Sequence, residues 1–324
     1  MNALTRIQIF AILILNLLFL GACNRVESMH EVGYLDIPIT NLLIEEPYLY
    51  VGGPGVAIYS LDDPLHPQLV GEYDSWYGTH QFSISDDYGF LASWSASLEV
   101  VDLREPNRPI PLTPYRYSIQ AAGVATHNNV AYFVDGGPYF KGIHILDIRD
   151  PSSLIEIANL PDIGAYSNGG VQIVVEDEYL FVKHRNGPDF EYDLIIFDVS
   201  DPSTPHEISR IVDIGAINEI EIDQDRLYVV SVGRGLSIYD ITNISNPKRI
   251  GFYRSNLPNS AVAVDGDYAY LTDLFTVKTL DISNIKQPRV VAEKEMDQAW
   301  DVAMYDSYVY VADSDGLFIF KTRK

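Results

Sequence analysis

The sequence predicts an all-β protein, a seven-bladed β-propeller of four-stranded antiparallel blades. Three observations predict it: an aromatic residue that ends a strand-like triplet recurs seven times, an apolar run follows the triplets, and a turn rich in Asp, Asn, Ser and Pro follows the runs. The aromatic residues are 40 to 49 positions apart. Four short strands per repeat of this length, with no helical stretch, are typical of propeller blades.

The first two strands of each repeat are marked by this aromatic residue and by an apolar residue eight positions before it. Apolar and polar residues alternate after the upstream position, which predicts a half-buried strand. The aromatic residues are Tyr50, Phe90, Tyr132, Phe181, Tyr228, Tyr270 and Tyr310. The upstream apolar residues are Leu42, Phe82, Val124, Ile173, Ile220, Val262 and Val302.

The third strand is an apolar run that ends in aspartate in five of the seven repeats, at Asp102, Asp147, Asp198, Asp240 and Asp281. An acid repeated around a ring is expected to cap a turn, accepting backbone N–H groups, rather than to act in catalysis. A fourth strand follows the turn, as in segments 68–73 and 249–253.

The two ends of the chain are predicted to share one blade. The seventh repeat ends at segment 317–321, before its fourth strand, while segment 30–34 is similar to the fourth strands at 69–73 and 250–253. We therefore expect residues 30–36 to complete the last blade and close the ring, which covers an edge that would otherwise be exposed. The predicted propeller spans residues 30–324.

The repeats resemble the LVIVD-repeat family. Leu146-Asp147-Ile148, and Ile196 to Val199 followed by Asp201-Pro202, carry the pattern best. The resemblance covers essentially all of residues 30–324. It implies a propeller in an extracytoplasmic, often surface-attached, bacterial protein, and it implies no activity because the family has no common catalytic motif.

The N-terminal segment predicts secretion and lipidation. Arg6 precedes an apolar run of signal-peptide length at 7–19, so residues 1–22 are expected to be removed. Leu20 to Cys23 resembles the bacterial lipobox, which implies that Cys23 is acylated and becomes the mature N-terminus. The alternative is an ordinary secretory signal with a chance cysteine, but Cys23 is the only cysteine of the chain.

Two further expectations follow for location. In the sorting pattern that the lipobox resembles, Asn24 rather than Asp favours the outer membrane, on either its periplasmic or its outer surface. The lipidated N-terminus and tether, residues 23–29, are short, so the propeller is expected to lie close to the membrane through its lipid anchor.

Composition and motifs exclude several classes of function. The net charge of −23 argues against binding a nucleic acid backbone. A single cysteine allows no intramolecular disulfide and no Cys-cluster zinc site. The sequence contains no nucleophile elbow, P-loop, dinucleotide fingerprint or HExxH motif, so it indicates no cofactor, metal or catalytic residue. The run from Asp313 to Gly316 looks like half a calcium loop, but a hairpin turn is the favoured interpretation.

The position just before each first strand is expected to line the mouth of the central channel. It is occupied by Asn41, Gln81, Gly123, Gln172, Glu219, Ala261 and Asp301. One interpretation is a solvated lining that holds water. The other is a ligand or cation site at the channel mouth that uses Gln81, Gln172, Glu219 and Asp301, with Trp300 beside them.

A second candidate surface comes from enlarged connections. Segments 135–142 and 183–192, and the links 74–80 and 161–170, are longer than the basic repeat requires and are expected to share one face. Aromatic residues with Arg are typical of binding hot spots and of sugar stacking. The candidate residues are Tyr139, Phe140, Tyr166, His184, Arg185, Phe190 and Tyr192, with Trp76, Tyr77 and His80 from the first link. Lys183, His184 and Arg185 form a basic patch suited to an anionic group. The alternative to a binding role for the enlarged connections is neutral drift of loop length.

The sequence thus favours a non-enzymatic, lipid-anchored module of the cell envelope that binds a protein or glycan. The alternatives are a propeller enzyme, a lyase or hydrolase with its site at the channel mouth, and a purely structural envelope component.

Overall fold

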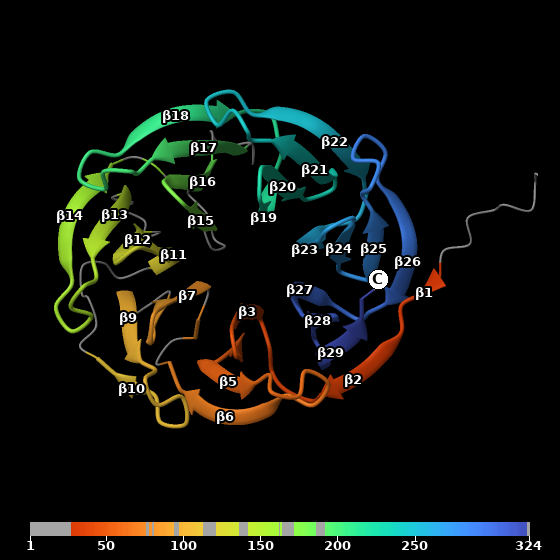
Figure 1. Cartoon of the computed structure of the whole chain (residues 1–324), viewed down its shortest axis with the longest axis horizontal. Coiled ribbons are helices and arrows are strands. Elements are labelled where there is room, and N and C mark those ends of the chain that lie inside the picture. The colour runs from red at the N-terminus through yellow and green to blue at the C-terminus, as the bar shows by residue number, and fades with distance from the viewer. Residues whose placement is uncertain are drawn as a thin grey trace, which may run out of the picture.

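The computed structural model describes residues 27–75, 78–79, 81–93, 97–112, 121–135, 142–161, 163, 172–185 and 192–322. They form seven sheets arranged as blades around a central channel (Figure 1). The fold prediction is therefore confirmed: the protein is a seven-bladed β-propeller with four-stranded antiparallel blades.

Blades 1 to 3 follow one another along the chain. The strands of blade 1 are β3 (Asn41–Glu45), β4 (Tyr48–Gly52), β5 (Val56–Ser60) and β6 (Gln68–Tyr73). Those of blade 2 are β7 (Gln81–Ser85), β8 (Tyr88–Ser93), β9 (Ser97–Asp102) and β10 (Ile110–Pro111). Those of blade 3 are β11 (Ala121–His127), β12 (Val130–Asp135), β13 (Gly142–Asp147) and β14 (Ile155–Leu160).

Blades 4 to 6 repeat the same order. Blade 4 contains β15 (Ile173–Glu176), β16 (Tyr179–Arg185), β17 (Tyr192–Asp198) and β18 (His206–Ile211). Blade 5 contains β19 (Ile217–Asp223), β20 (Arg226–Ser231), β21 (Gly235–Asp240) and β22 (Lys248–Arg254). Blade 6 contains β23 (Asn259–Asp265), β24 (Tyr268–Asp273), β25 (Thr276–Asp281) and β26 (Arg289–Glu295).

Blade 7 is built from both ends of the chain. It contains β27 (Ala299–Tyr305), β28 (Tyr308–Asp313) and β29 (Gly316–Lys321), and its outer strand is β2 (Glu31–Leu35). Strand β2 pairs antiparallel with β29, with Glu31 opposite Phe320 and Leu35 opposite Leu317. The predicted ring closure by the N-terminal segment is therefore confirmed.

The N-terminal segment also contacts blade 6, which the sequence pattern did not predict. Strand β1 (Glu27–Ser28) pairs parallel with β26 and adds a fifth strand to that blade (Figure 1). The backbone N–H of Met29 donates to the carbonyl of Glu293, and the Met29 side chain is buried in the core between blades 6 and 7. Residues 27–35 therefore connect two neighbouring blades at their outer edge.

The repeated residues explain the regularity of the ring. All seven aromatic residues of the second strands are buried. The five aspartates that end third strands each accept the backbone N–H two residues later, as in Asp240 to Thr242 at 3.0 Å. The guanidinium or hydroxyl group of the same partner residue also donates to each carboxylate, and this side-chain hydrogen bond is the main reason, with the backbone N–H contributing less, that the pKa of each of the five carboxyls lies below its usual value. The predicted turn-capping role is confirmed.

A small residue in the fourth strand lets adjacent blades approach closely. A Cβ atom on Gly71 would lie 2.0 Å from the carbonyl oxygen of Pro106, and one on Gly251 would lie 2.1 Å from that of Ile285. In each case the carbonyl belongs to the turn between the third and fourth strands of the next blade. In blade 4 the same place is taken by Ser209, whose hydroxyl donates to the Ile244 carbonyl at 2.7 Å.

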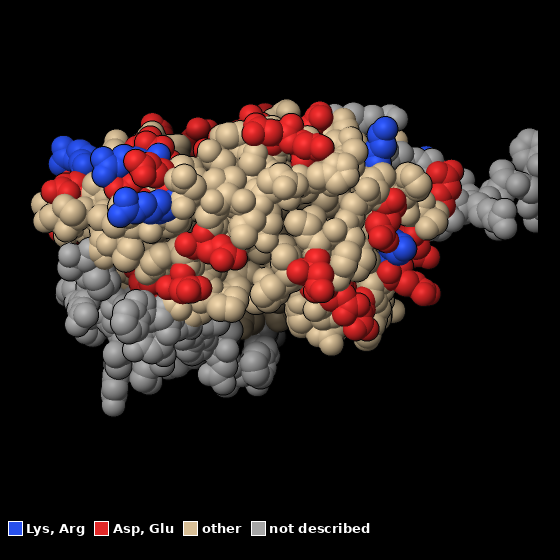
Figure 2. Space-filling view, turned by 90° about the horizontal axis from the view of Figure 1, so that it is seen from below, with Lys and Arg blue, Asp and Glu red and all other residues tan. Residues whose placement is uncertain are grey.

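The two faces of the ring differ in composition. The turn face carries the turns between the first and second and between the third and fourth strands, and the loop face carries the other turns and the links between blades. The first hairpins on the turn face are rich in acids: Glu45, Glu46, Asp86, Asp87, Glu176, Asp177, Glu178, Asp223, Asp225, Asp265, Asp267 and Asp306. The edge-on view in Figure 2 shows acidic side chains at both margins of the rim, with Lys and Arg gathered in a few places.

Candidate functional site: the central channel and the loop face

The central channel contains a cavity of about 540 Å³ lined by first strands and by the residues just before them. Side chains alternate along a strand, so every second residue faces the channel. Nearest the loop face is the upper level, at positions Asn41, Gln81, Gly123, Gln172, Glu219, Ala261 and Asp301. Two residues further along each strand is the middle level, at positions Leu43, Ser83, Ala125, Val174, Glu221, Ala263 and Ala303.

The polar residues of the upper level connect neighbouring blades. Asp301 Oδ2 accepts the backbone N–H of Leu42 at 2.7 Å, which joins blade 7 to blade 1. Three further side-chain oxygens do the same for their next blades: Gln81 to Val124 at 3.3 Å, Gln172 to Ile220 at 2.8 Å and Glu219 to Val262 at 3.1 Å. The four candidate ligand residues line the channel cavity, and each also has a bracing role that the sequence pattern did not indicate; their role as ligands stays a prediction.

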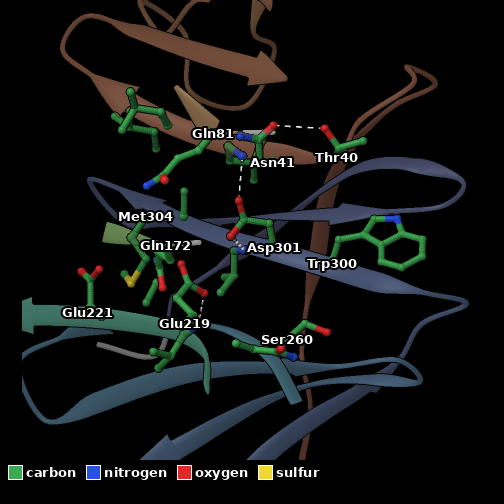
Figure 3. Close-up of a pocket in the computed structure, with 18 of the residues that line it drawn as sticks. Thr40, Asn41, Gln81, Gln172, Glu219, Glu221, Ser260, Trp300, Asp301 and Met304 are labelled. Carbon is green, nitrogen blue, oxygen red and sulfur yellow. Dashed lines mark hydrogen bonds between the residues drawn. The ribbon is translucent and has the colours of Figure 1, made fainter. Parts of the chain in front are cut away.

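Three carboxyl groups, those of Glu219, Glu221 and Asp301, line the cavity (Figure 3), and the pKa of each is raised. Burial raises the pKa of Asp301 to about 6, although the N–H groups of Leu42 and Val302 oppose the shift. Burial raises the pKa of Glu219 well above its usual value, and the charges of Asp301 and Glu221 add to this effect. Burial raises the pKa of Glu221 to about 8, with further contributions from Asp301 and from two acids nearer the turn face, Asp223 and Glu176.

Glu221 differs from the other two carboxylates. It is the single ionisable residue of the middle level, and among the residues that the structure describes it has no hydrogen-bond or ion-pair partner. The cavity is lined by no Lys, Arg or His within the described part of the chain. In the same described ranges, no group of three or more His, Cys, Asp or Glu is placed to hold a metal ion.

Trp300 lies at the mouth of the channel with 40% of its surface exposed. In Figure 3 its ring lies on one side of the Glu219–Asp301 pair and Glu221 lies on the other. Polar residues from three other blades line the same mouth, namely Thr40, Asn218 and Ser260. The channel thus has an aromatic and hydroxyl-rich mouth, a pair of carboxylates below it, and one further carboxylate within.

Most of the predicted residues on enlarged connections fall outside the described residues. These are Tyr139, Phe140, Tyr166 and Phe190, with Trp76, Tyr77 and His80 from the first link, and for Arg185 the described part is the backbone. His184 is half-buried in β16. Whether this surface binds a ligand stays a prediction.

Two residues of this region belong to the interior of blade 4 rather than to its surface. Tyr192 is 6% exposed and packs in the core. Lys183 is also buried, its Nζ lies 5.1 Å from the centre of the Tyr192 ring, and burial lowers its pKa to about 8. Lys183 therefore adds little to an exposed basic patch, and Tyr192 offers little surface for stacking.

The exposed large hydrophobic residues of the described chain have an uneven distribution. Five lie on the loop face, in turns, links or strand starts of blades 4 to 7: Val212, Val232, Leu257, Phe275 and Trp300. Six lie on outer strands: Tyr34, Leu69, Ile110, Ile155, Ile157 and Phe252. Of the six, Leu69, Ile110 and Ile155 lie at the starts of outer strands and so toward the turn face, whereas the described turns of the turn face carry no exposed large hydrophobic residue. The loop face therefore combines the channel mouth with exposed apolar surface.

A family model described as "LVIVD repeat" matches residues 79–115, 120–161, 171–213, 214–255, 259–293 and 297–320, which is well over half of the chain. The chain belongs to the LVIVD-repeat family. The matched segments correspond to blades 2 to 7 of the LVIVD propeller, and blade 1 lies outside them.

Solved structures share the fold of this LVIVD propeller at low sequence identity. The β-propeller domain of Cps50 (Swd1) from Myceliophteria thermophila is 12% identical with a TM-score of 0.71, and the alignment covers 91% of this chain and 100% of that chain. BamB from Moraxella catarrhalis is 14% identical with a TM-score of 0.57 and coverage of 88% and 83%. The computationally designed protein Ika8 is 8% identical with a TM-score of 0.64 and coverage of 91% and 99%. No curated protein matches the chain in sequence.

The predicted lipidation site, Cys23, lies outside the described residues, as does all of segment 1–26. In the part of the chain that the structure describes, we find no helix with the length and hydropathy needed to cross a membrane.

Proposed function

We propose that this LVIVD-repeat propeller is a lipid-anchored, non-enzymatic binding module of the bacterial cell envelope, and that its loop face holds a protein or glycan partner. The observation that carries the proposal is the distribution of exposed apolar side chains. Five of them lie in turns, links or strand starts of the loop face, which also holds the channel mouth, and the described turns of the turn face have none. Exposed apolar and aromatic residues grouped on one face are typical of interaction sites.

The chemistry of the loop face suits either kind of partner. Trp300 and Phe275, which are 40% and 54% exposed, offer flat rings that pack into a protein partner or stack on sugars. The turn face is suited to solvent, because its first hairpins carry twelve acids and two basic residues, Arg226 and His127.

The anchor part of the proposal rests on Cys23 within its lipobox-like sequence. Strand β1 begins at Glu27, so the outer edge of blade 6 starts four positions after the lipid-bearing residue. An extended chain of that length reaches about 14 Å. The propeller would then lie next to the membrane that holds it, which we propose is the outer membrane.

The test is crosslinking and capture from native envelopes with the full chain. Phe275→Ser combined with Trp300→Ala should abolish capture, because both changes remove apolar contact area from the loop face. The matched control is Leu69→Ser combined with Phe252→Ser, which removes similar exposed groups from outer strands. The proposal is wrong if the two double variants, both folded, lose capture equally or keep it equally.

The raised pKa values of the channel carboxyls favour a second candidate, a lyase or hydrolase with its site at the channel mouth. A carboxyl group that titrates near neutral pH is suited to general acid–base catalysis. Incubation with envelope glycans would then release new sugar ends, and Glu219→Gln and Asp301→Asn, which keep an acceptor oxygen for bracing, would abolish that release. Release that persists in both variants would exclude this site.

A further inference from the structure

Glu221 has no structural role that the fold requires. The corresponding middle-level positions of the other six blades are uncharged, at Leu43, Ser83, Ala125, Val174, Ala263 and Ala303. Glu219 and Asp301 hold the N–H groups of neighbouring blades, whereas Glu221 has no such partner in the described structure. Glu221 is half-buried in the channel lining, and a carboxylate that is held there without a partner costs stability, so its presence points to a functional role.

The electrostatics of the cavity define the charge of its ligand. Three carboxyl groups, Glu219, Glu221 and Asp301, line it, and Asp223 and Glu176 add negative charge from the side of the turn face. The described lining contains no basic residue. A cleft lined by one sign of charge with low-dielectric walls concentrates ions of the opposite sign.

The geometry favours an organic cation over a metal ion. A divalent metal needs several oxygen ligands at one point, but the oxygens of Gln81, Gln172, Glu219 and Asp301 accept N–H groups of the blade wall. No described group is placed to hold a metal. An ammonium or guanidinium group needs fewer acceptors, and its alkyl chain packs on apolar walls.

The walls of the cavity provide such surfaces. Leu43, Val264, Ala303 and Met304 line it beside the carboxylates. Trp300 lies at the mouth, where an aromatic ring attracts a passing cation through its π face. We propose that the central channel binds an alkylammonium or alkylguanidinium group, with Glu221 as its main counter-ion and Glu219 and Asp301 as supporting charges.

This proposal goes beyond the proposed partner on the loop face and does not require one. Its ligand has two sources with the same chemistry: a free amine, or a Lys or Arg side chain of a protein that reaches the channel mouth. In either case binding should release protons near neutral pH. A cation beside Glu221 favours the charged carboxylate, so a group with a pKa of about 8 loses its proton when the cation arrives.

The experiment is calorimetric titration of the full chain, purified in detergent, at neutral pH in two buffers with different ionisation enthalpies. The probes are 1,5-diaminopentane, agmatine and Nα-acetyl-lysine methylamide, with 1,5-pentanediol and calcium chloride as comparisons. We expect the three cationic organic probes to bind with buffer-dependent enthalpy, and the diol and calcium to bind at least about tenfold more weakly. A diamine that binds about tenfold better than the lysine derivative identifies a free amine as ligand, and equal affinity identifies a side chain.

Glu221→Gln should weaken binding of the organic cations by about tenfold or more and remove the buffer dependence. The matched control is Glu178→Gln, an exposed acid on the turn face, which should change neither property. The proposal is overturned if the organic cations fail to bind at about 10 mM, if both variants weaken binding equally, or if calcium binds more tightly than they do. If Glu221→Gln fails to fold, the unmodified protein still tests the proposal, because its affinity must fall between pH 8 and pH 5 as Glu221 and Asp301 take up protons.

Discussion

The carboxylate of Asp301 in blade 7 accepts the backbone N–H of Leu42 in blade 1, with an Oδ2 to N distance of 2.7 Å. This hydrogen bond crosses the junction between the last and first blades from the channel side. Strand β2 completes blade 7 on the outer side of the ring. The junction that closes the propeller is therefore held at both its inner and outer edges.

Two substitutions at Asp301 distinguish the contribution of this hydrogen bond to stability from the contribution of the negative charge. Asp301→Asn removes the charge and keeps an acceptor oxygen, whereas Asp301→Ala removes both. We expect Asp301→Ala to be less stable than Asp301→Asn by about 1–3 kcal/mol at neutral pH, because it leaves the Leu42 N–H without its partner. Urea unfolding measures the difference, and equal stability of the two variants would show that the hydrogen bond has no energetic role.

The raised pKa of Glu221 predicts a specific pH dependence of stability. Its folded pKa of about 8 lies above the ordinary value of 4.5, so the folded state binds the proton more tightly than the unfolded state does. The stability from this group is full below pH 4.5 and is lost as the pH rises to about 8. Glu221→Gln should therefore match the unmodified protein at acid pH and exceed its free energy of unfolding by a few kcal/mol at pH 8.

Denaturant unfolding at several pH values measures this effect, and Glu178→Gln is the exposed control. A constant difference across the whole pH range would contradict the assignment. The capping aspartates act in the opposite sense, because their lowered pKa values give stability that is present above their ordinary pKa and lost as the pH falls. At neutral to basic pH, Glu221→Gln is thus expected to raise the free energy of unfolding and, at the same time, to weaken binding of the proposed cation.

The N-terminal segment predicts a graded loss of stability on truncation. Deleting residues 24–29 removes β1 and the buried Met29 but leaves β2 in blade 7. Deleting residues 24–36 also removes β2, exposes the edge of β29 and should lower the free energy of unfolding by several kcal/mol. The shorter deletion should cost clearly less. Thermal and urea unfolding compare the two, and equal losses would mean that β2 does not stabilise the ring.

The repeat made the architecture predictable, because each blade contains the same local signals. The aromatic residue of the second strand and the aspartate at the end of the third occur blade after blade, so their burial and capping roles follow from position alone. Ring closure was predictable for the same reason, since segment 30–34 carries the pattern of a fourth strand. Strand β1 has only two residues, and no other blade has a fifth strand like it, so the repeat pattern could not predict it.

The candidate site was predictable in position but not in detail. The spacing placed Gln81, Glu219 and Asp301 around one mouth, yet their bonds to the next blade depend on how the blades are packed. Glu221 was not singled out, although a charged residue at a middle-level position that is uncharged in six other blades is a signal visible in the repeat alignment. Lys183 and Tyr192 belong to a repeat with an enlarged turn, and periodicity gave no indication that both are buried.

The glycines of the fourth strands predict that substitution by alanine lowers stability by different amounts in different blades. A Cβ atom would lie 2.1 Å from a backbone carbonyl at Gly251 but 3.0 Å from one at Gly33, the same position in blade 7. Gly251→Ala should therefore cost about 1–3 kcal/mol through overpacking, and Gly33→Ala should cost less. Thermal unfolding of the two variants checks the order, and a reversed order would contradict the blade-to-blade contact described above.

The last prediction concerns Cys23 and the location of the protein. Cys23→Ser removes the thiol that would carry the lipid, so the protein should accumulate in the soluble fraction or as an uncleaved precursor. Fractionation of cells with immunoblotting measures this, and labelling with a palmitate analogue checks the acyl chain directly. Ser28→Ala is the matched control, because Ser28 lies in β1 on the same segment and has no part in the lipobox. If Cys23→Ser leaves both processing and membrane association unchanged, the lipobox interpretation fails, and the proposed membrane-adjacent position fails with it because β1 would no longer be tied to an anchor.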